Sequence, residues 1–435
     1  MNFPMKHILN IIYILALMLY SPVIVYRAIK QGRYRVGWDQ RLGKIKLKSD
    51  DKPCIWIHAV SMGEVNSTKT IVQGLEDKLP QYNIAISTTT DTGYARATAL
   101  YADKHSVFFF PFDFSFVMKR AFKNIRPTLC ILVELELWPN FIQTCKDSNI
   151  PVMVVNGRIS DRSFPSYKKI RCLVSRIFKN LTLVLAQTDE YAQRFIHLGC
   201  EAKNVITTGS LKYDTAQIAD IVAGADIIAD KLNISNQPLI VAGGTGPGEE
   251  KIMLDVYKKL LDKNIAKNLR LAVVPRKPER FDEVAAIIEQ AGFTIDRYSR
   301  YKTDDSLKSK SADSVIRVDT MGDVRKFYSL SKISFVGRSL VPMGGSDMIE
   351  SAALAKTTIF GPHTFNFKQS VEVLLAGDGA IEVQDEKQLY EAIKKCLTDA
   401  QYAEKIARNG QDVIRRNQGA TKKTVEAVEK LLNRR

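Results

Sequence analysis

The sequence predicts an α/β protein built from two doubly wound domains in tandem, and three observations point to this fold class. The chain has 435 residues, more than one ordinary domain of about 100–200 residues requires. After residue 50, short and continuously apolar segments alternate with helix-like segments, a pattern typical of a parallel sheet covered by helices on both faces. The alternation loosens between residues 214 and 230 and then resumes, which indicates a connection between two domains.

The apolar segments give the expected strands of each domain. In the first domain they are 54–60, 83–88, 106–112, 128–133, 151–156, 181–187 and 204–208. In the second they are 238–242, 269–274, 314–318, 333–336, 357–360 and 380–383. We expect a helix over 64–79, a surface loop over 303–311 and mainly helices after residue 385. The predicted parts of the chain are residues 1–48, a first domain 49–215, a second domain 226–410 and a C-terminal helix 411–435.

The first 50 residues combine an apolar segment with a basic flank. Residues 8–25 are almost wholly apolar, which is near the lower length limit for a membrane-spanning helix. Residues 1–50 contain nine Lys or Arg and two Asp, and most of the cations follow the apolar segment. This asymmetry predicts a membrane anchor with the rest of the chain on the cytoplasmic side. The short length and Pro22 leave open a helix that lies in the membrane surface.

The remaining charge and the cysteines narrow the classes of partner. A formal net charge of +16 favours an anionic partner such as nucleic acid, anionic lipid or a phosphorylated substrate. The sequence contains no recognisable nucleic-acid-binding module, so we expect no nucleic-acid partner. The six cysteines are scattered and form no CxxC pair, which predicts no zinc site and favours a reducing compartment.

In the first domain, charged residues follow three predicted strands or turns. Glu64 opens a helix after the strand 54–60 and is either a helix cap or a general base. Glu134 and Glu136 end the apolar strand 128–133, where a buried carboxylate is costly unless it is paired or functional. Lys212 lies at the end of the domain and is either solvated or placed to neutralise a phosphate.

In the second domain, the candidate segments are rich in glycine or in cations. The turn 242–250 contains four glycines and either cradles anionic oxygens or is only a tight turn. Arg276 and Lys277 leave the strand 269–274, a suitable position for holding a phosphate. A second glycine-rich turn, 337–346, leads into a helix that Asp347 is expected to cap, with Glu350 one turn inside. Two consecutive domains of this type place a ligand in the cleft between them, at the carboxyl ends of the strands.

Together these segments resemble the Kdo (3-deoxy-D-manno-octulosonic acid) transferase family. The stretches that match occur in the family's order between about residues 40 and 370. They are HAVSMGE, STTTDTGYARA, PFD, VELELWPN, NGRISDRS, AQTDEYAQRF, GSLKYD, PRKPERF, DTMGD, VGRSLVPMGG and GPHTFNF. The resemblance implies a GT-B fold of two Rossmann-like domains, an acceptor-side one and a nucleotide-sugar-binding one, behind an N-terminal membrane-anchor helix. It implies a glycosyltransferase that moves Kdo from CMP-Kdo to a lipid A precursor in lipopolysaccharide synthesis, with inversion and without a metal or other cofactor.

The resemblance also assigns roles to residues. Glu64 falls on the proposed general base, and Glu134 and Lys212 fall on positions that stabilise the transition state. The residues expected to contact the CMP of the donor are Pro275, Arg276, Met321, Gly322, Asp323, Asp347, Met348, Ile349 and Glu350. Lys212, Arg276 and the helix at Asp347 are suited to stabilise charge on the leaving phosphate. The expected location is the cytoplasmic face of the inner membrane, in contact with membrane lipids and the lipid A precursor.

The chain departs from the family pattern at five positions. Gly246, Lys277 and Ser346 stand where the family usually has histidines, Asp347 stands for an asparagine, and Arg338 stands for a glycine. Lys277 keeps a positive charge but does not titrate near neutrality. Two alternatives to an active Kdo transferase therefore stay open: a related membrane-bound transferase with a changed donor or acceptor, and a non-catalytic relative that binds nucleotide or glycolipid. The sequence leaves the number of Kdo residues transferred, the acylation and phosphorylation of the acceptor, and the oligomeric state open.

Overall fold

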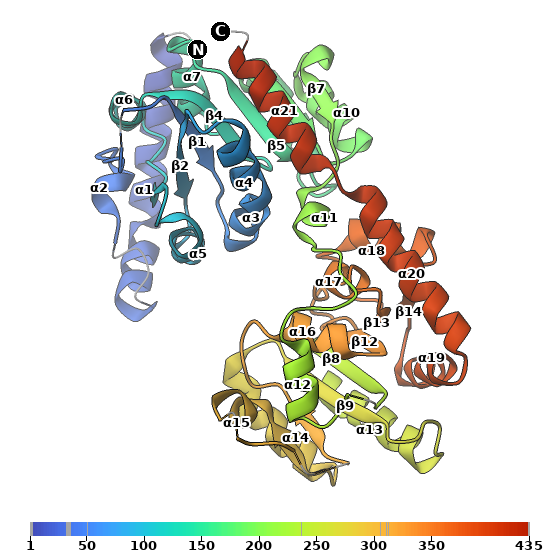
Figure 1. The fold of residues 1–435 in the computed structure, drawn as a ribbon. Helices are drawn as coiled ribbons and strands as arrows, with labels where there is room; N and C mark the ends of the chain where they lie inside the picture. The colour runs from blue at the N-terminus through green and yellow to red at the C-terminus, as the bar shows by residue number, and fades with distance from the viewer. Residues whose placement is uncertain are drawn as a thin grey trace. The chain divides into compact units, whose positions relative to one another are not determined.

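The fold comes from a computed structural model that describes residues 3–31, 36–49, 51–235, 237–304, 306–309, 311 and 313–433 (Figure 1). The chain divides into two compact units. The first comprises Met1–Thr215 together with Gln418–Arg435, and the second comprises Ala216–Asn417. Each unit is built around its own parallel sheet, as the apolar pattern predicts.

The first unit contains a seven-stranded parallel sheet in the order β3-β2-β1-β4-β5-β6-β7. Its strands are β1 (Cys54–His58), β2 (Asn83–Thr88), β3 (Ser106–Phe109), β4 (Pro127–Val133), β5 (Val152–Gly157), β6 (Leu183–Ala186) and β7 (Val205–Thr207). Each lies within or next to a segment expected from the sequence. One apolar cluster covers each face of the sheet, and Trp56, which is fully buried, packs against Phe108, Phe122 and Phe141 in one of them.

Helices cover both faces of this sheet. They are α2 (Trp38–Arg41), α3 (Met62–Ser67), α4 (Lys69–Lys78), α5 (Asp91–Tyr101), α6 (Ser115–Ile125), α7 (Pro139–Asp147), α8 (Phe164–Lys169), α9 (Arg171–Phe178), α10 (Asp189–Leu198), α11 (Leu211–Thr215) and α21 (Ala420–Asn433). A short 3-10 helix spans Ala202–Asn204. The expected helix over 64–79 is two helices that meet at Thr68, because the Thr68 hydroxyl and N–H both bond to the Val65 carbonyl oxygen and tighten the turn.

Two segments from the ends of the chain pack on the first unit. The C-terminal α21 lies along α4 (Figure 1), where Val425 contacts the surface at Gly74 so closely that a methyl group on Gly74 would not fit. The N-terminal α1 (Phe3–Gln31) is fastened by polar side chains: the Asn10 amide bonds to the Ser115 hydroxyl at 2.8 Å, and the Tyr13 hydroxyl donates to Asp113 at 3.0 Å. Among the described helices, none combines the length and apolarity needed to cross a membrane, so the predicted anchor is not confirmed.

The second unit contains another seven-stranded parallel sheet, in the order β10-β11-β9-β8-β12-β13-β14. Its strands are β8 (Leu239–Thr245), β9 (Arg270–Pro275), β10 (Ile295–Arg297), β11 (Val315–Arg317), β12 (Ile333–Val336), β13 (Thr357–Phe360) and β14 (Ile381–Glu382). Strand β10 was not expected from the sequence, because it is three residues long and two of them are charged. Its pairing with β11 at the sheet edge forms it.

The helices of the second unit again lie on both sides of the sheet. They are α12 (Ala225–Lys231), α13 (Glu249–Asp262), α14 (Phe281–Gln290), α15 (Tyr298–Thr303), α16 (Val324–Leu330), α17 (Ile349–Ala352), α18 (Lys368–Ala376), α19 (Glu386–Thr398) and α20 (Ala400–Asn417), with a 3-10 turn at Pro278–Arg280. Part of the expected loop 303–311 lies outside the described residues, and its described residues after Thr303 form no helix or strand.

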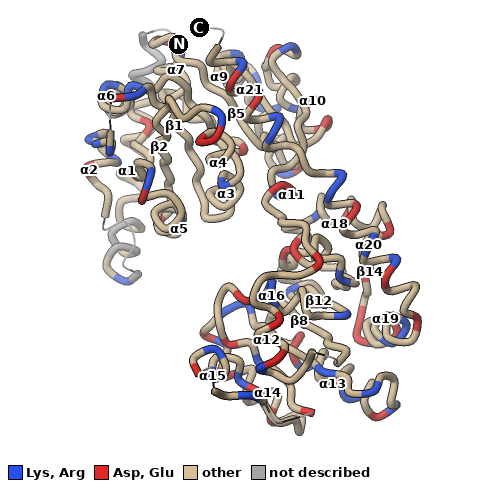
Figure 2. The backbone as a smooth tube through the Cα atoms, in the orientation of Figure 1, with Lys and Arg blue, Asp and Glu red and all other residues tan. Residues whose placement is uncertain are grey.

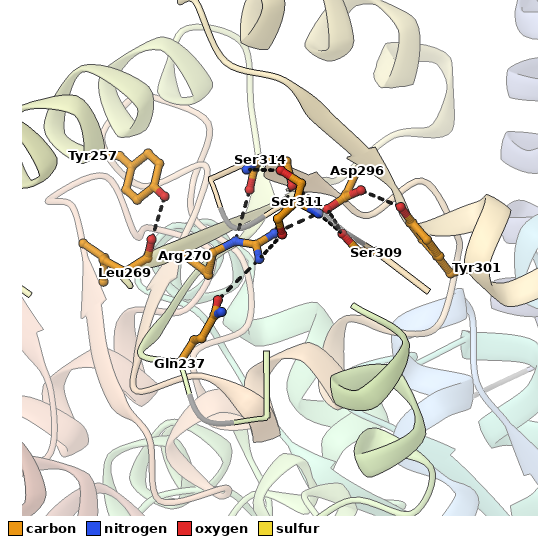
Figure 3. A network of polar contacts seen from close by, with 9 residues as sticks. All are labelled: Gln237, Tyr257, Leu269, Arg270, Asp296, Tyr301, Ser309, Ser311 and Ser314. Carbon is orange, nitrogen blue, oxygen red and sulfur yellow. Dashed lines mark hydrogen bonds and ion pairs between the residues drawn. The ribbon is translucent and has the colours of Figure 1, made fainter. Parts of the chain in front are cut away.

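A buried polar network ties β9 to β10 and to the loop before β11 (Figure 3). The Arg270 side chain is fully buried and bonds to the carbonyl oxygens of Ser311 and Ser314 and to the Asp296 carboxylate. Asp296 also accepts hydrogen bonds from Ser309 at 2.7 Å and Tyr301 at 2.5 Å. A buried ion pair is tolerated when hydrogen bonds satisfy both partners, as they do here. Because Arg270 begins β9 and Arg276 follows its end, the network supports the fold at the opposite end of the strand from the candidate donor residues.

Removing the Asp296 carboxylate should destabilise the second unit. Asp296→Ala leaves the Arg270 charge buried without its partner, so we expect the free energy of unfolding to fall by about 3–5 kcal/mol. Urea unfolding of the full chain measures the change. Glu289→Ala, an exposed position on α14, is the control and should change stability by no more than about 0.5 kcal/mol. Equal effects of the two substitutions would contradict the structural role of the network.

Candidate functional site

Glu64 lies in the first turn of α3, which follows β1, and its carboxylate bonds to the turn between the two elements. It accepts hydrogen bonds from the Val60 N–H and from the Ser61 hydroxyl, both at 2.8 Å. Ser61 is the N-cap of α3 and in turn accepts from the Glu64 N–H. Glu64 therefore does serve as a helix cap, which was the plainer of the two expectations. The same contacts fix the direction of its carboxylate, which a general base also requires.

Two further carboxylates lie close to Glu64. Burial raises the pKa of Glu64, and the negative charge of Glu134 raises it further. Burial also raises the pKa of Glu136 to about 7, with contributions from the charges of Glu64 and Glu134. A carboxyl group with a pKa near 7 is suited to proton transfer at neutral pH. Glu136 was part of a predicted segment but had no role assigned, because only the structure shows how close the three acids are.

The backbone near Glu134 is held in an unusual conformation. Glu134 and Asn156 both have positive φ angles, 62° and 54°, at the ends of the neighbouring strands β4 and β5. Such angles are uncommon for residues other than glycine and asparagine, so the one at Glu134 is the more unusual of the two. The Asn156 side-chain oxygen accepts from the Leu211 N–H at 3.2 Å, and Leu211 directly precedes Lys212 in α11. Asn156 thus connects the end of β5 with the helix that carries Lys212, a role that the sequence did not reveal.

Several buried polar atoms at the same end of this sheet have no hydrogen-bond partner within the described part of the chain. They include His58 Nε2, Thr88 Oγ1 and Asn156 Nδ2, which belong to β1, β2 and β5. Burial lowers the pKa of His58 to about 3, so its ring is neutral at physiological pH. Because buried polar groups are normally paired, unpaired ones at strand ends are candidates for contact with a ligand or with water.

In the second unit, the charges of Arg276 and Asp347 both act on Glu350. Burial raises the pKa of Glu350 to about 7, the charge of Asp347 adds to this effect, and the charges of Arg325 and Arg276 oppose it. The pKa of the buried Tyr328 is raised by burial and by the same two carboxylates. The sequence did not indicate Arg325 and Tyr328, which lie on α16 and interact electrostatically with the predicted donor residues. Asp347 accepts from the Ile349 N–H at 3.0 Å in the turn before α17. The N-cap of α17 is Met348, which makes no side-chain capping bond, so the expected helix cap at Asp347 is not confirmed.

The other predicted nucleotide contacts differ in exposure. Pro275, Met348 and Ile349 have buried side chains, and the Ile349 N–H and carbonyl oxygen already bond within the chain, to Asp347 and to the Ala353 N–H. Met321 and Gly322 are exposed in the loop after β11. Asp323 is buried and pairs with Lys302 at 2.6 Å and with Lys326 at 3.4 Å. Lys326 and Arg325 are adjacent on α16, so this helix connects the Asp323 loop with the group around Glu350.

Within the described residues, no group of three or more His, Cys, Asp or Glu side chains is arranged to hold a metal ion. The family histidine positions have other contacts here. The Gly246 N–H donates to Glu249 at 2.9 Å, the Ser346 hydroxyl donates to the Gly244 carbonyl oxygen at 3.1 Å, and Lys277 is exposed.

Comparisons with known proteins place this arrangement in a family. Residues 36–215 match the family model described as 3-deoxy-D-manno-octulosonic-acid transferase (kdotransferase). A 3-deoxy-D-manno-octulosonic acid transferase of Haemophilus influenzae is 32% identical over 409 residues, which cover 94% of each chain. The chain belongs to the Kdo transferase family. The family is one of glycosyltransferases, which agrees with the expectation from the motifs.

Other relatives add a contrast in length and a comparison of fold. A bifunctional glycosyltransferase/methyltransferase of Fusobacterium nucleatum is 33% identical to this chain over 88% of its residues. The matched region covers only 58% of that relative's length. The solved UDP-GlcNAc 2-epimerase of Neisseria meningitidis is 13% identical, covers 87% of this chain and all of its own, and has a TM-score of 0.55. This likeness supports the predicted GT-B type of fold with two Rossmann-like units. A solved C-terminal CMP-Kdo binding domain of WaaA from Acinetobacter baumannii is 29% identical over 44% of this chain and 95% of its own, but its TM-score of 0.40 is too low for a comparison of fold.

The raised pKa of Glu136 predicts how stability depends on pH. The folded-state pKa of about 7 lies above the ordinary value of 4.5, so the folded chain binds this proton more tightly than the unfolded chain. The resulting stabilisation is complete below about pH 4.5 and is lost as the pH rises through 7. Raising the pH from 5 to 8 should therefore cost the wild type about 1–2 kcal/mol more than Glu136→Gln, after allowance for solvent screening.

Urea unfolding at the two pH values measures this difference. Glu201→Gln, an exposed acid of the same unit, is the control and should keep the pH dependence of the wild type. If Glu136→Gln also keeps the wild-type dependence, Glu136 is ionised throughout and the interpretation is wrong.

Proposed function

We propose that the chain transfers Kdo from CMP-Kdo to a hydroxyl group of a lipid A precursor, with inversion at the anomeric carbon and without a metal or other cofactor. The observation that carries this proposal is the set of interacting carboxylates formed by Glu64, Glu134 and Glu136. The 3-deoxy-D-manno-octulosonic acid transferase of H. influenzae, which aligns over 94% of both chains, supports it. Membership of the family supports the proposed donor and acceptor, and the positions of the residues support their proposed roles.

Glu64 is the residue we propose as general base. Burial and the charge of Glu134 raise its pKa, which makes its carboxylate a stronger base toward an acceptor hydroxyl. As Glu64 takes the proton, the acceptor oxygen bonds to the anomeric carbon of Kdo, and the bond from that carbon to the phosphate oxygen of CMP breaks. Attack from the side opposite the leaving group inverts the anomeric centre.

The leaving CMP takes the electron pair of the broken bond as negative charge on its phosphate. Cationic side chains and N–H donors stabilise such charge most where they are already in place before the reaction. Arg276, at the end of β9, is one candidate in the second unit, and Lys212, whose helix is held by Asn156, is one in the first. We assign Asp347 and Glu350 to the ribose hydroxyls, because carboxylates accept hydrogen bonds from such groups.

A changed donor is the second candidate function, and one observation favours it. Asp347 stands where the family has asparagine, and its charge adds to the raised pKa of Glu350 in the donor region. A negatively charged nucleotide is bound less well beside Asp347 than it would be beside a neutral asparagine, because like charges repel. The mass of the product formed from CMP-Kdo, or the absence of a product, decides between the two candidates.

The proposed reaction is tested by CMP release. Detergent-solubilised protein with CMP-Kdo and a lipid A precursor should release CMP only when the acceptor is present. Glu64→Gln should lower the rate at least about 100-fold, because it removes the base while keeping the shape of the side chain. Glu201→Gln should react as the wild type does. A folded wild-type protein that binds CMP but releases none from CMP-Kdo would refute Kdo transfer.

We also propose that α1 attaches the enzyme to the cytoplasmic face of the inner membrane by lying in the membrane surface. Its polar residues Asn10 and Tyr13 face the first unit, while large apolar side chains elsewhere on it are exposed. The exposed ones are Ile11, Ile12, Ile14, Leu15, Met18, Leu19, Tyr20, Val23, Tyr26 and Ile29. Helix α6, to which α1 is fastened, adds Lys119, Arg120 and Lys123 (Figure 2), which attract anionic lipid headgroups.

Vesicle flotation tests this attachment. The purified protein should float with vesicles that contain anionic phospholipid, and Leu15→Glu with Leu19→Glu should lower the bound fraction several-fold, because Leu15 is 59% exposed and Leu19 is 81% exposed. The double variant Glu201→Gln, Glu289→Gln alters exposed acids elsewhere and is the control. Undiminished flotation of the leucine variant would rule out attachment through this face.

A further inference from the structure

A single buried carboxylate binds the N–H groups of both glycine-rich turns in the second unit. Glu249, the first residue of α13, has no exposed surface. Its Oε1 accepts from the N–H groups of Ser339 and Leu340 at 2.8 and 2.9 Å. Its Oε2 accepts from the N–H groups of Gly246, at 2.9 Å, and Arg338. All four donors are therefore already used by an anion that belongs to the chain.

The segment that Glu249 binds leads directly to the candidate donor residues. Residues 337–346 follow β12, and Asp347 is the next residue. Within them, the Gly345 N–H bonds to the Arg338 carbonyl oxygen at 2.7 Å, so the end of the turn is tied to its beginning. The Ser346 hydroxyl bonds to the Gly244 carbonyl oxygen at 3.1 Å. Fixing residues 338–340 therefore also restricts Ser346 and the positions of Asp347 and Glu350 that follow.

The turn needs such a restraint, because its conformation is not one the chain adopts freely. Arg338 has a φ of 60°, in the left-handed region that disfavours residues other than glycine. Gly337 lies so close to Thr245 that a methyl group at Gly337 would be 2.6 Å from the Thr245 Cα atom. The N–H groups of Arg338 and its two successors donate hydrogen bonds to Glu249, and these bonds hold this strained and crowded backbone in place.

We propose that Glu249 is a positioning residue of the donor site. Its carboxylate takes the place of a ligand anion on the four N–H groups and fixes residues 337–346, so that Asp347 and Glu350 are presented to the nucleotide. This inference rests on the proposed function for the identity of the nucleotide. It also means that the donor's phosphate binds elsewhere than at these four N–H groups. The turn 242–250, which the sequence had offered as a cradle for anionic oxygens, supplies one of them, from Gly246.

The exchange of Glu249 for glutamine is a specific test, because the two side chains have the same shape. A carboxylate offers two accepting oxygens, and each receives two N–H groups here. Glutamine offers one accepting oxygen and an NH₂ group, which faces two N–H donors and cannot accept from them. Glu249→Gln therefore loses two of the four hydrogen bonds and leaves two buried N–H groups unpaired.

Glu250→Gln is the matched control. Glu250 is the next residue, is equally buried, and is also fully bonded, but to different partners: the Thr245 hydroxyl at 2.8 Å and the Arg280 guanidinium at 2.6 and 3.1 Å. Its loss should lower the thermal stability of the protein without releasing the turn after β12. A general loss of stability is thereby separated from a loss of positioning.

Two measurements on the full-length, detergent-solubilised protein test the proposal. Hydrogen exchange should become at least ten times faster at the amides of residues 338–340 in Glu249→Gln and stay unchanged there in Glu250→Gln. Titration calorimetry with CMP should show about tenfold weaker binding for Glu249→Gln, and a change of less than twofold for Glu250→Gln.

The outcomes separate this proposal from the proposed function. Unchanged exchange at residues 338–340, or equal weakening of CMP binding by both variants, would overturn the positioning role. If the wild type itself binds no CMP, the proposed function fails and the donor role of Glu249 fails with it. Exchange at residues 338–340 then still decides whether Glu249 holds the turn.

Discussion

The loops of both units keep their conformation through one type of interaction, in which carboxylates accept hydrogen bonds from backbone N–H groups. In parallel sheets, the loops at one end of the strands turn sharply and leave N–H groups without helix or strand partners. Glu249 satisfies four of them in the second unit. Glu64 does the same for Val60, and Asp113 does so for Asn140 and Phe141. These bonds fix the loops from which the candidate site residues project.

The same burial that makes these contacts strong also changes the chemistry of the carboxyl groups. Glu136 and Glu350 both have pKa values raised to about 7, each by burial first and by neighbouring carboxylates second. Asp113 reaches a similar value through burial, although three hydrogen bonds oppose the shift. The difference lies in their partners. Asp113 is enclosed by Tyr13 and backbone groups and is structural, whereas Glu136 has other acids beside it, an arrangement typical of sites that move protons.

Polar side chains fasten the helices near both ends of the chain, α1 and α21, to the rest of the first unit. Asp214, which lies on α11 together with Lys212, accepts from the N–H groups of Gly419 and Thr421. These two bonds hold the start of α21 beside α11. Asn10 and Tyr13 fasten α1 near Asp113 and the start of α6. In an apolar segment these two polar residues look like interruptions. In the structure they determine which side of the helix faces the protein and which side carries exposed apolar groups.

The sequence by itself determined the alternation of strands and helices, the two parallel sheets and the family, because these depend on local apolar patterns and on motifs of neighbouring residues. It did not reveal β10, whose three residues form a strand only through pairing with β11, or the break at Thr68. It indicated Glu64, Arg276 and Asp347 because they follow strands. Only the tertiary structure decided that the charge of Glu64 raises the pKa of Glu136, that Asn156 bonds to the helix of Lys212, and that Glu249 binds a turn about 90 residues later in the chain. The physical reason is that pKa shifts, buried hydrogen bonds and strained backbone depend on distance and burial between residues far apart in the sequence.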